Sequence, residues 1–250
     1  VATQTAAYEE IHEVSPATLV AADLDLTGSR ENAGRVIRAN LANSADMLSF
    51  HDRYKDSSPL ARLKANVAWI HMQEPAPPPL WQLQAIANPA RIFNFYAHVP
   101  PLSSGYDPIV DASTIVTYYL NLMAIGIERF FVPGFAIDPF KDLWQPNHRI
   151  FNVDGRLHPN AVALSHFMRN LEGARFDRVY KIENSFDFFT FLRERGALGV
   201  LVNRSSGALH VDAIPDGIAA SEIFGNLIQF PAEIGRTPTY FHAEGFSTAQ

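Results

Sequence analysis

The sequence contains no cysteine in its 250 residues. Disulfide bridges, thiolate nucleophiles and zinc sites built on cysteine are therefore excluded. The nine histidines show no His-x-x-x-His or comparable ligand spacing, so we expect neither a metal site nor another cofactor. The glycine patterns of nucleotide-binding loops and the Gly-x-Ser-x-Gly pattern of serine hydrolases are missing as well.

Basic and apolar runs are also scarce. The net charge is -6 and no basic stripe occurs, which argues against a nucleic-acid partner. The longest apolar stretch, residues 115–127, is interrupted by Thr117, Asn121 and Gly126, and is shorter than the roughly 18–20 residues of a membrane span. We interpret it as a core helix. The lack of cysteine fits a secreted, periplasmic or cell-surface protein, which is the location we expect.

The first two-thirds of the chain alternate between strand-like and helix-like patterns. Strands are expected at residues 18–22, 47–50, 80–86 and 127–132, and helices at residues 4–14, 31–41, 59–73, 107–124 and 159–171. Such alternation is typical of βαβ units and predicts an α/β fold with a parallel sheet.

After Gly173 the pattern changes to short segments rich in β-branched and aromatic residues, with turn residues between them. These segments are residues 176–182, 186–192, 198–202, 209–213 and 239–242. They predict a small antiparallel β-sandwich. We therefore expect two domains, residues 1–173 and residues 174–250.

Two of the expected strands carry a recognisable pattern of side chains. Residues 46–54 read Asp-Met-Leu-Ser-Phe-His-Asp-Arg-Tyr, and residues 79–86 read Pro-Leu-Trp-Gln-Leu-Gln-Ala-Ile. The first resembles the motif Asp-x-x-Ser-x-His-x-Tyr on the sixth strand of the clan A retaining glycoside hydrolases, which are (β/α)8 barrels. The second takes the place of their seventh strand. Residues 152–163 and 223–240 resemble the last barrel helix and the closing strands of the appended β-sandwich, so the resemblance covers nearly the whole chain.

The catalytic carboxylate of that family has no counterpart here. The family reads roughly Pro-x-Trp-x-Thr-Glu-x-Gly on its seventh strand, and its Glu is the nucleophile; this chain has Gln84 at that position, with Leu83 and Ile86 also departing from the pattern. Retaining hydrolysis uses two carboxyl groups about 5 Å apart, and a carboxamide is a poor nucleophile. The resemblance therefore implies a natural loss of hydrolysis in this chain.

The first half of the barrel is missing from the resemblance, together with the family's acid/base Glu. A closed barrel needs eight βα units, and only four are expected here. A half barrel leaves open sheet edges, which attract other strands. We therefore expect another polypeptide to complete or cover the barrel edge.

The resemblance also implies a carbohydrate site, formed by His51, Tyr54, Trp81, Gln84 and Trp144. Trp144 would offer an aromatic platform to the apolar face of a sugar ring. For the side chains of His51, Tyr54, Trp81 and Trp144, packing in the protein interior is the alternative interpretation.

Three aspartates, Asp23, Asp25 and Asp52, are the residual acid candidates, with solvated loop carboxylates as the alternative. Two other functions therefore stay open. One is an active retaining glycosidase whose carboxylates come from a companion chain or from these aspartates. The other is an assembly subunit that uses the fold as a scaffold and binds no sugar.

Overall fold

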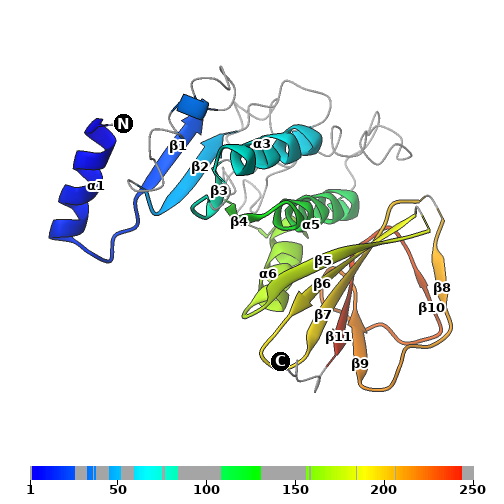
Figure 1. Cartoon of the computed structure of the whole chain (residues 1–250). Coiled ribbons are helices and arrows are strands. Elements are labelled where there is room, and N and C mark those ends of the chain that lie inside the picture. Colours follow the sequence, from blue (N-terminus) through cyan, green and yellow to red (C-terminus); the bar gives the residue numbers. More distant parts are fainter. Residues whose placement is uncertain are drawn as a thin grey trace. The chain divides into compact units, whose positions relative to one another are not determined.

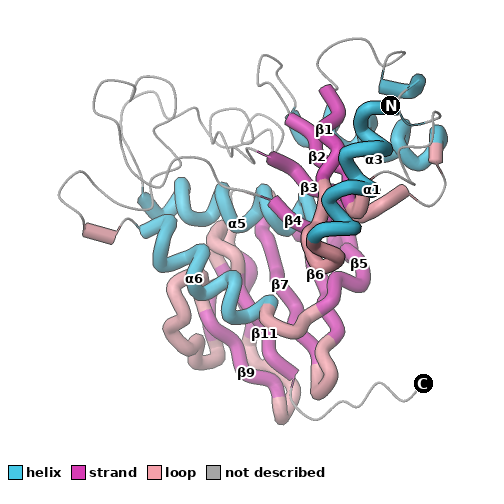
Figure 2. Tube along the Cα trace, turned by 90° about the vertical axis from the view of Figure 1, so that its left-hand side faces the viewer, coloured by secondary structure: helices cyan, strands magenta, loops and turns pink. Residues whose placement is uncertain are grey.

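The computed structural model describes residues 2–25, 33–35, 37, 45–51, 59–74, 77–83, 108–130, 156–157, 159–183, 185–205 and 207–243 (Figures 1 and 2). The chain divides into two compact units. The first comprises Val1–Ile86 with Ile125–Pro133, and the second comprises Ala87–Ala124 with Gly134–Gln250. Each unit has its own sheet and is described separately.

The first unit is built on a four-stranded parallel sheet. Its strands lie in the order of the sequence: β1 (Ala21–Asp25), β2 (Met47–His51), β3 (Leu80–Leu83) and β4 (Ile127–Phe130). Each strand pairs in parallel with the next along the chain. This sequential parallel order confirms the βαβ alternation that the hydrophobic pattern predicts.

Two helices of this unit match their expected positions closely. Helix α1 spans Ala2–Val14 and helix α3 spans Pro59–Gln73. Proline suits the first position of α3, and the prolines at 77–79 follow its end. Helix α3 buries one face, formed by Leu63, Asn66, Val67 and Ile70. This spacing of three and four residues is that of a helix packed on a core.

Strand β1 begins later than the sequence predicts. We expected a strand at residues 18–22 with Asp23 and Asp25 at its carboxyl end, but the strand is Ala21–Asp25. The residues before it are held elsewhere, because the Thr18 amide donates to the Ser15 carbonyl and the Val20 amide donates to the Asp46 carboxylate. Asp23 and Asp25 therefore lie within the strand itself.

The described part of the second unit has two helices and an antiparallel sheet. Helix α5 spans Pro108–Ala124 and helix α6 spans Pro159–Leu171. The five-stranded sheet has the order β5-β6-β7-β11-β9, and β10 pairs separately with β8. The bounds are β5 Arg175–Ile182, β6 Phe186–Leu192, β7 Ala197–Asn203, β8 Leu209–Val211, β9 Ile218–Ser221, β10 Ala232–Ile234 and β11 Thr239–Ala243. The antiparallel strands expected after Gly173 are thus present, with β9 and β10 added to those predicted.

The two-stranded β8–β10 ladder packs against one face of the five-stranded sheet. Ile234 on β10 forms a buried cluster with Phe186 on β6 and Leu201 on β7. The partly buried side chains around this cluster are Phe188, Leu209, Val211, Phe230 and Phe241. Alternate residues of β6 and β7 therefore face this small core.

Helix α6 buries one face, formed by Asn160, Ala163, Leu164, Phe167 and Asn170. Its His166 ring contacts the Tyr240 ring of β11 edge-on, with 4.8 Å between the centroids. Helix α5 is the core helix that the sequence predicts, since its residues 112–120 are all buried. Within the described ranges, no helix combines the length and apolarity that a membrane span requires.

Candidate functional site

The carboxyl ends of the parallel strands form the candidate site. Strand β1 ends at Asp25, β2 at His51 and β3 at Leu83. The backbone register pairs Asp25 with His51, and His51 with Leu83. The three strand ends are therefore level with one another, and Gln84 follows directly in the chain. The carboxyl edge is where parallel α/β sheets and barrels bind their ligands.

The residues predicted for the site are described to different extents. His51 is the last residue of β2 and Trp81 the second of β3, and only their backbones lie among the described atoms. The other three, Tyr54, Gln84 and Trp144, lie outside the described residues. Of the aspartates, Asp23 and Asp25 lie on β1, in register with Ser49 and His51, and Asp52 lies outside the described residues.

Ser49 lies two residues before the end of β2 and has a structural role. It is fully buried, and its hydroxyl donates to the carbonyl oxygen of Ala22 at 3.5 Å, which links β2 to β1. The serine of the strand motif therefore supports the sheet beneath the candidate site.

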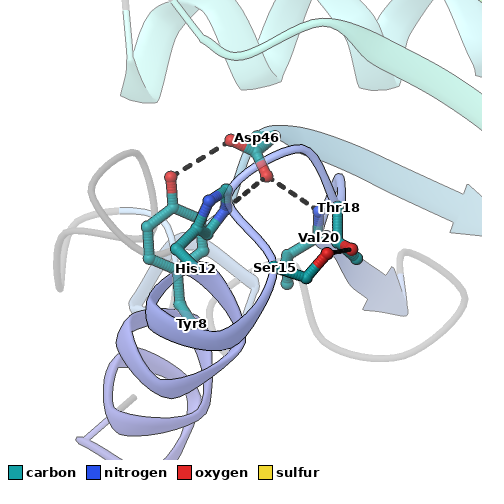
Figure 3. A network of polar contacts seen from close by, with 6 residues as sticks. All are labelled: Tyr8, His12, Ser15, Thr18, Val20 and Asp46. Atoms are coloured by element: carbon teal, nitrogen blue, oxygen red, sulfur yellow. Dashed lines mark hydrogen bonds and ion pairs between the residues drawn. The ribbon is translucent and has the colours of Figure 1, made fainter.

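Asp46, the first residue of the same motif, lies at the opposite, amino edge of the sheet (Figure 3). Its Oδ2 accepts hydrogen bonds from the Val20 amide at 2.8 Å and from His12 Nε2 at 3.0 Å, and its Oδ1 accepts one from the Tyr8 hydroxyl at 3.1 Å. One carboxylate thus joins α1, the start of β1 and the start of β2.

These hydrogen bonds shift the pKa values of the groups involved. The Val20 amide, more than any other group, holds the pKa of Asp46 below its usual value, with further contributions from His12 and Tyr8 and partial opposition from burial. The Tyr8 pKa is raised, mainly because its hydroxyl donates to the carboxylate. No sequence motif indicates this network, although Tyr8 and His12 are four residues apart on a helix and so share a face.

A half-buried histidine and a buried serine lie in contact in the second unit. His166 Nε2 lies 3.2 Å from Ser221 Oγ, and the Asn170 amide lies 2.9 Å from the same nitrogen. Ser221 Oγ also lies 3.5 Å from His242 Nε2. Desolvation lowers the His166 pKa, Arg169 lowers it further, and the charge of Glu222 opposes the shift.

This pair resembles a nucleophile and its base, but its surroundings give it a structural role. Ser221 is only 3% exposed, so a substrate has no access to its hydroxyl. The Asn170 amide already donates to the nitrogen that would have to take a proton from serine. The pair joins α6 to β9.

Asn203 begins Asn-Arg-Ser, a formal glycosylation triplet. Its amide nitrogen donates to the Gly207 carbonyl at 2.6 Å, and its Oδ1 accepts from the amide and the hydroxyl of Ser205, each at 2.8 Å. The residue is 6% exposed. The nitrogen that would carry a glycan is therefore enclosed in a turn.

Among the described residues, no group of three or more histidine, aspartate and glutamate side chains is arranged to hold a metal ion.

Comparisons of the sequence with protein families and with curated proteins find no match. Comparison of the structures finds a family 39 glycoside hydrolase from the gut symbiont Bacteroides cellulosilyticus WH2, with a TM-score of 0.63 and 12% identity over 96% of this chain. The fold is glycoside-hydrolase-like. A GH30 endoxylanase from Clostridium papyrosolvens C71 has a TM-score of 0.57 and 12% identity over 93% of the chain, and an α-amylase from Lactobacillus plantarum has a TM-score of 0.51 and 12% identity over 96%.

The glycoside-hydrolase-like chain spans little more than half of each of these structures. It covers 54% of the family 39 enzyme, 57% of the endoxylanase and 58% of the α-amylase. At such low identities the likeness concerns the fold, and function has to be argued from the site.

Proposed function

We propose that this chain is a glycoside-hydrolase-like protein that does not hydrolyse glycosides by itself and keeps a carbohydrate-binding or structural role beside another polypeptide. The observation that carries the proposal is the level register of Asp25, His51 and Leu83, with Gln84 next in the chain. Gln84 follows the end of β3, and we infer that it takes the position of the family's nucleophile.

The chemistry at this edge favours binding over bond cleavage. A neutral amide can donate and accept hydrogen bonds with sugar hydroxyls, but it does not form the covalent intermediate of retaining hydrolysis. We propose that His51, Tyr54, Trp81, Gln84 and Trp144 contact the sugar, with the aromatic rings packing against its apolar face. The protein would act in a secreted, periplasmic or cell-surface location.

The open sheet supports the proposal of another polypeptide. Within the described ranges the parallel sheet has four strands, whereas a closed barrel of this type has eight. We propose that residues 1–173 form a partial barrel and residues 174–250 a β-sandwich, with the partner at the barrel edge.

An active retaining glycosidase is the second candidate. The position of Asp25 favours it, because this carboxylate-bearing residue ends β1 directly beside His51. A second carboxylate from a companion chain would complete the pair that hydrolysis requires.

Two measurements on the purified chain separate these functions. Calorimetric titration with xylo-oligosaccharides and malto-oligosaccharides should detect binding that is lost in Trp144→Ala and His51→Ala and retained in Met72→Ala, a control on the exposed side of α3. Release of nitrophenol from aryl xylosides and glucosides should stay at background. Hydrolysis that disappears in Asp25→Asn would favour the glycosidase, and the absence of any binding would favour a scaffold.

A further inference from the structure

The turn before β9 contains an Asp-Gly pair, Asp216 and Gly217, between Pro215 and Ile218. The Ile218 amide donates to the Pro215 carbonyl at 3.2 Å, which closes the turn. Gly217 has a φ of 80°, a left-handed conformation that glycine adopts without steric cost. The turn leads directly into β9, which begins at Ile218.

The carboxyl group of Asp216 is available for reaction. The residue is exposed, and within the described part of the chain its side chain makes no hydrogen bond or ion pair. Other aspartates whose side chains the structure describes are each held by a neighbouring side chain; these are Asp46, Asp177, Asp187 and Asp212.

The amide nitrogen of Gly217 is available as well. It donates to no group among the described residues. A Cβ atom at this position would have no heavy atom within 4 Å beyond its chain neighbours, so the space around the glycine is open. Each of the other four aspartates is followed by a residue with a side chain, which hinders the approach of its amide nitrogen to the carboxyl group.

We propose that Asp216 and Gly217 form a site of spontaneous backbone modification, at which the chain isomerises to isoaspartate without an enzyme. The Gly217 nitrogen attacks Cγ of the protonated Asp216 carboxyl group, a C–N bond forms, and the hydroxyl leaves with the amide proton as water. The reaction is favoured because both groups are already held in one molecule. Its product is a five-membered cyclic imide.

Water then opens this ring at either of its two carbonyl carbons. Cleavage of the bond between the Gly217 nitrogen and Cγ restores aspartate. Cleavage of the bond between that nitrogen and the main-chain carbonyl carbon of Asp216 gives isoaspartate, in which the main chain runs through Cγ. One water is lost and one is regained, so the final mass is unchanged.

The modification should loosen the start of β9. It adds one methylene to the main chain between the Pro215 carbonyl and the Ile218 amide, whose hydrogen bond closes the turn. Strand β9 follows at once and pairs with β11 from Ile218 to Ser221. A turn that no longer closes removes the support at the beginning of this pairing, and local opening of the strand becomes easier.

Prolonged incubation of the purified chain, followed by peptide mapping with mass spectrometry, tests the proposal. The peptide that contains residue 216 should first lose one water and then regain its mass with a changed retention time. Fragmentation should place isoaspartate at residue 216. The conversion should be faster at pH 5 than at pH 8, because the hydroxyl leaves as water from the protonated carboxyl group.

Two variants and a matched control identify the reacting groups. Asp216→Glu keeps the charge and the glycine but would have to form a six-membered ring, so isomerisation should stop. Gly217→Ala should slow the reaction severalfold, because the added methyl group hinders ring closure. Asp212→Glu, in the same loop, should leave the rate unchanged, and circular dichroism should show that all three variants are folded.

Hydrogen exchange measures the structural consequence. After incubation the amides of β9 should exchange faster in the original chain and at an unchanged rate in Asp216→Glu. An unchanged rate in a chain that carries isoaspartate would overturn the loosening of β9.

The outcomes decide the inference without reference to the proposed function. Isoaspartate at residue 216 that is absent in Asp216→Glu would support it. Isomerisation at this residue only in urea would overturn it, because the folded turn would then protect the pair. Modification confined to the second Asp-Gly pair, Asp154 and Gly155, which lies outside the described residues, would overturn it as well.

Discussion

The ring of Phe188 lies directly over the backbone of Gly199, on the face of the five-stranded sheet that the β8–β10 ladder covers. A Cβ atom at position 199 would meet this ring, with Cε2 only 2.7 Å away. The glycine therefore allows the ring to approach the strand closely, a recognised role of glycine within strands. Phe188 in turn packs against the cluster of Phe186, Leu201 and Ile234.

Gly199→Ala should accordingly lower the free energy of unfolding by about 1–3 kcal/mol, the usual cost of overpacking a core. Urea denaturation followed by fluorescence measures it. Gly235→Ala is the matched control, since nothing lies within 4 Å of a Cβ there. In the double variant Gly199→Ala with Phe188→Leu the two changes should be less than additive, and full additivity would contradict the contact.

Asp46→Ala should release helix α1 from the sheet. The substitution removes three hydrogen bonds and should destabilise α1 locally by about 1–2 kcal/mol. Hydrogen exchange of the α1 amides measures the effect, with Glu13→Ala on the same helix as the control. Because the pKa of Asp46 is lowered in the folded chain, its contribution is present above the ordinary pKa of aspartate. It should be lost as the pH falls through the lower, folded value.

His166 should make the stability of the second unit depend on pH, and this dependence should lie at higher pH than that of Asp46. Its folded pKa is lowered, mainly by desolvation, so the unfolded chain takes up the proton first as the pH falls. The free energy of unfolding should therefore decrease as the pH falls below about 6.5, the ordinary histidine value, toward the folded pKa.

His166→Gln should flatten this dependence, because glutamine does not titrate and its side-chain oxygen can still accept from Asn170. Urea unfolding between pH 5 and 7.5 measures the free energy of unfolding of the two proteins. His71→Gln, at an exposed position of α3, is the control. An unchanged slope in His166→Gln would show that another group titrates in this range.

Asn203 should carry no glycan in the folded protein. Its amide nitrogen is enclosed and bonded to the Gly207 carbonyl, so an attached sugar would prevent formation of the turn. We would secrete the chain and its Ser205→Ala variant from a glycosylating yeast and measure the intact mass of each. Both should be free of glycan, and their masses should differ only by the substitution. A glycan on the folded fraction would contradict the burial of Asn203.

Much of the local structure follows from patterns within short segments. Helix α3 was predicted at its observed bounds because prolines flank it and its apolar residues recur at helical spacing. Strand β6 was predicted equally well from its dense phenylalanines. For β1 the pattern of residues 18–20 predicts a start that is too early, because the Val20 amide is held by a carboxylate 26 residues away.

The polar networks could not be predicted in the same way. Asp46 was identified only as part of a motif, and nothing near it in the sequence indicates that Tyr8 and His12 bind it. Ser221 and His166 are 55 residues apart, and their contact exists only because α6 packs against the antiparallel sheet. Pairs this far apart carry no spacing signal.

The sequence by itself determined the alternation of strands and helices, the change to antiparallel strands after Gly173, and the glutamine that directly follows the end of β3. These depend on residue type and on short periodic patterns, which are local properties of the chain. Tertiary structure alone decided that Asp25 and His51 stand side by side at one edge of the sheet and that Asp46 anchors α1 at the other. Strand register and helix docking depend on packing between distant segments, so these relationships arise only once the chain has folded.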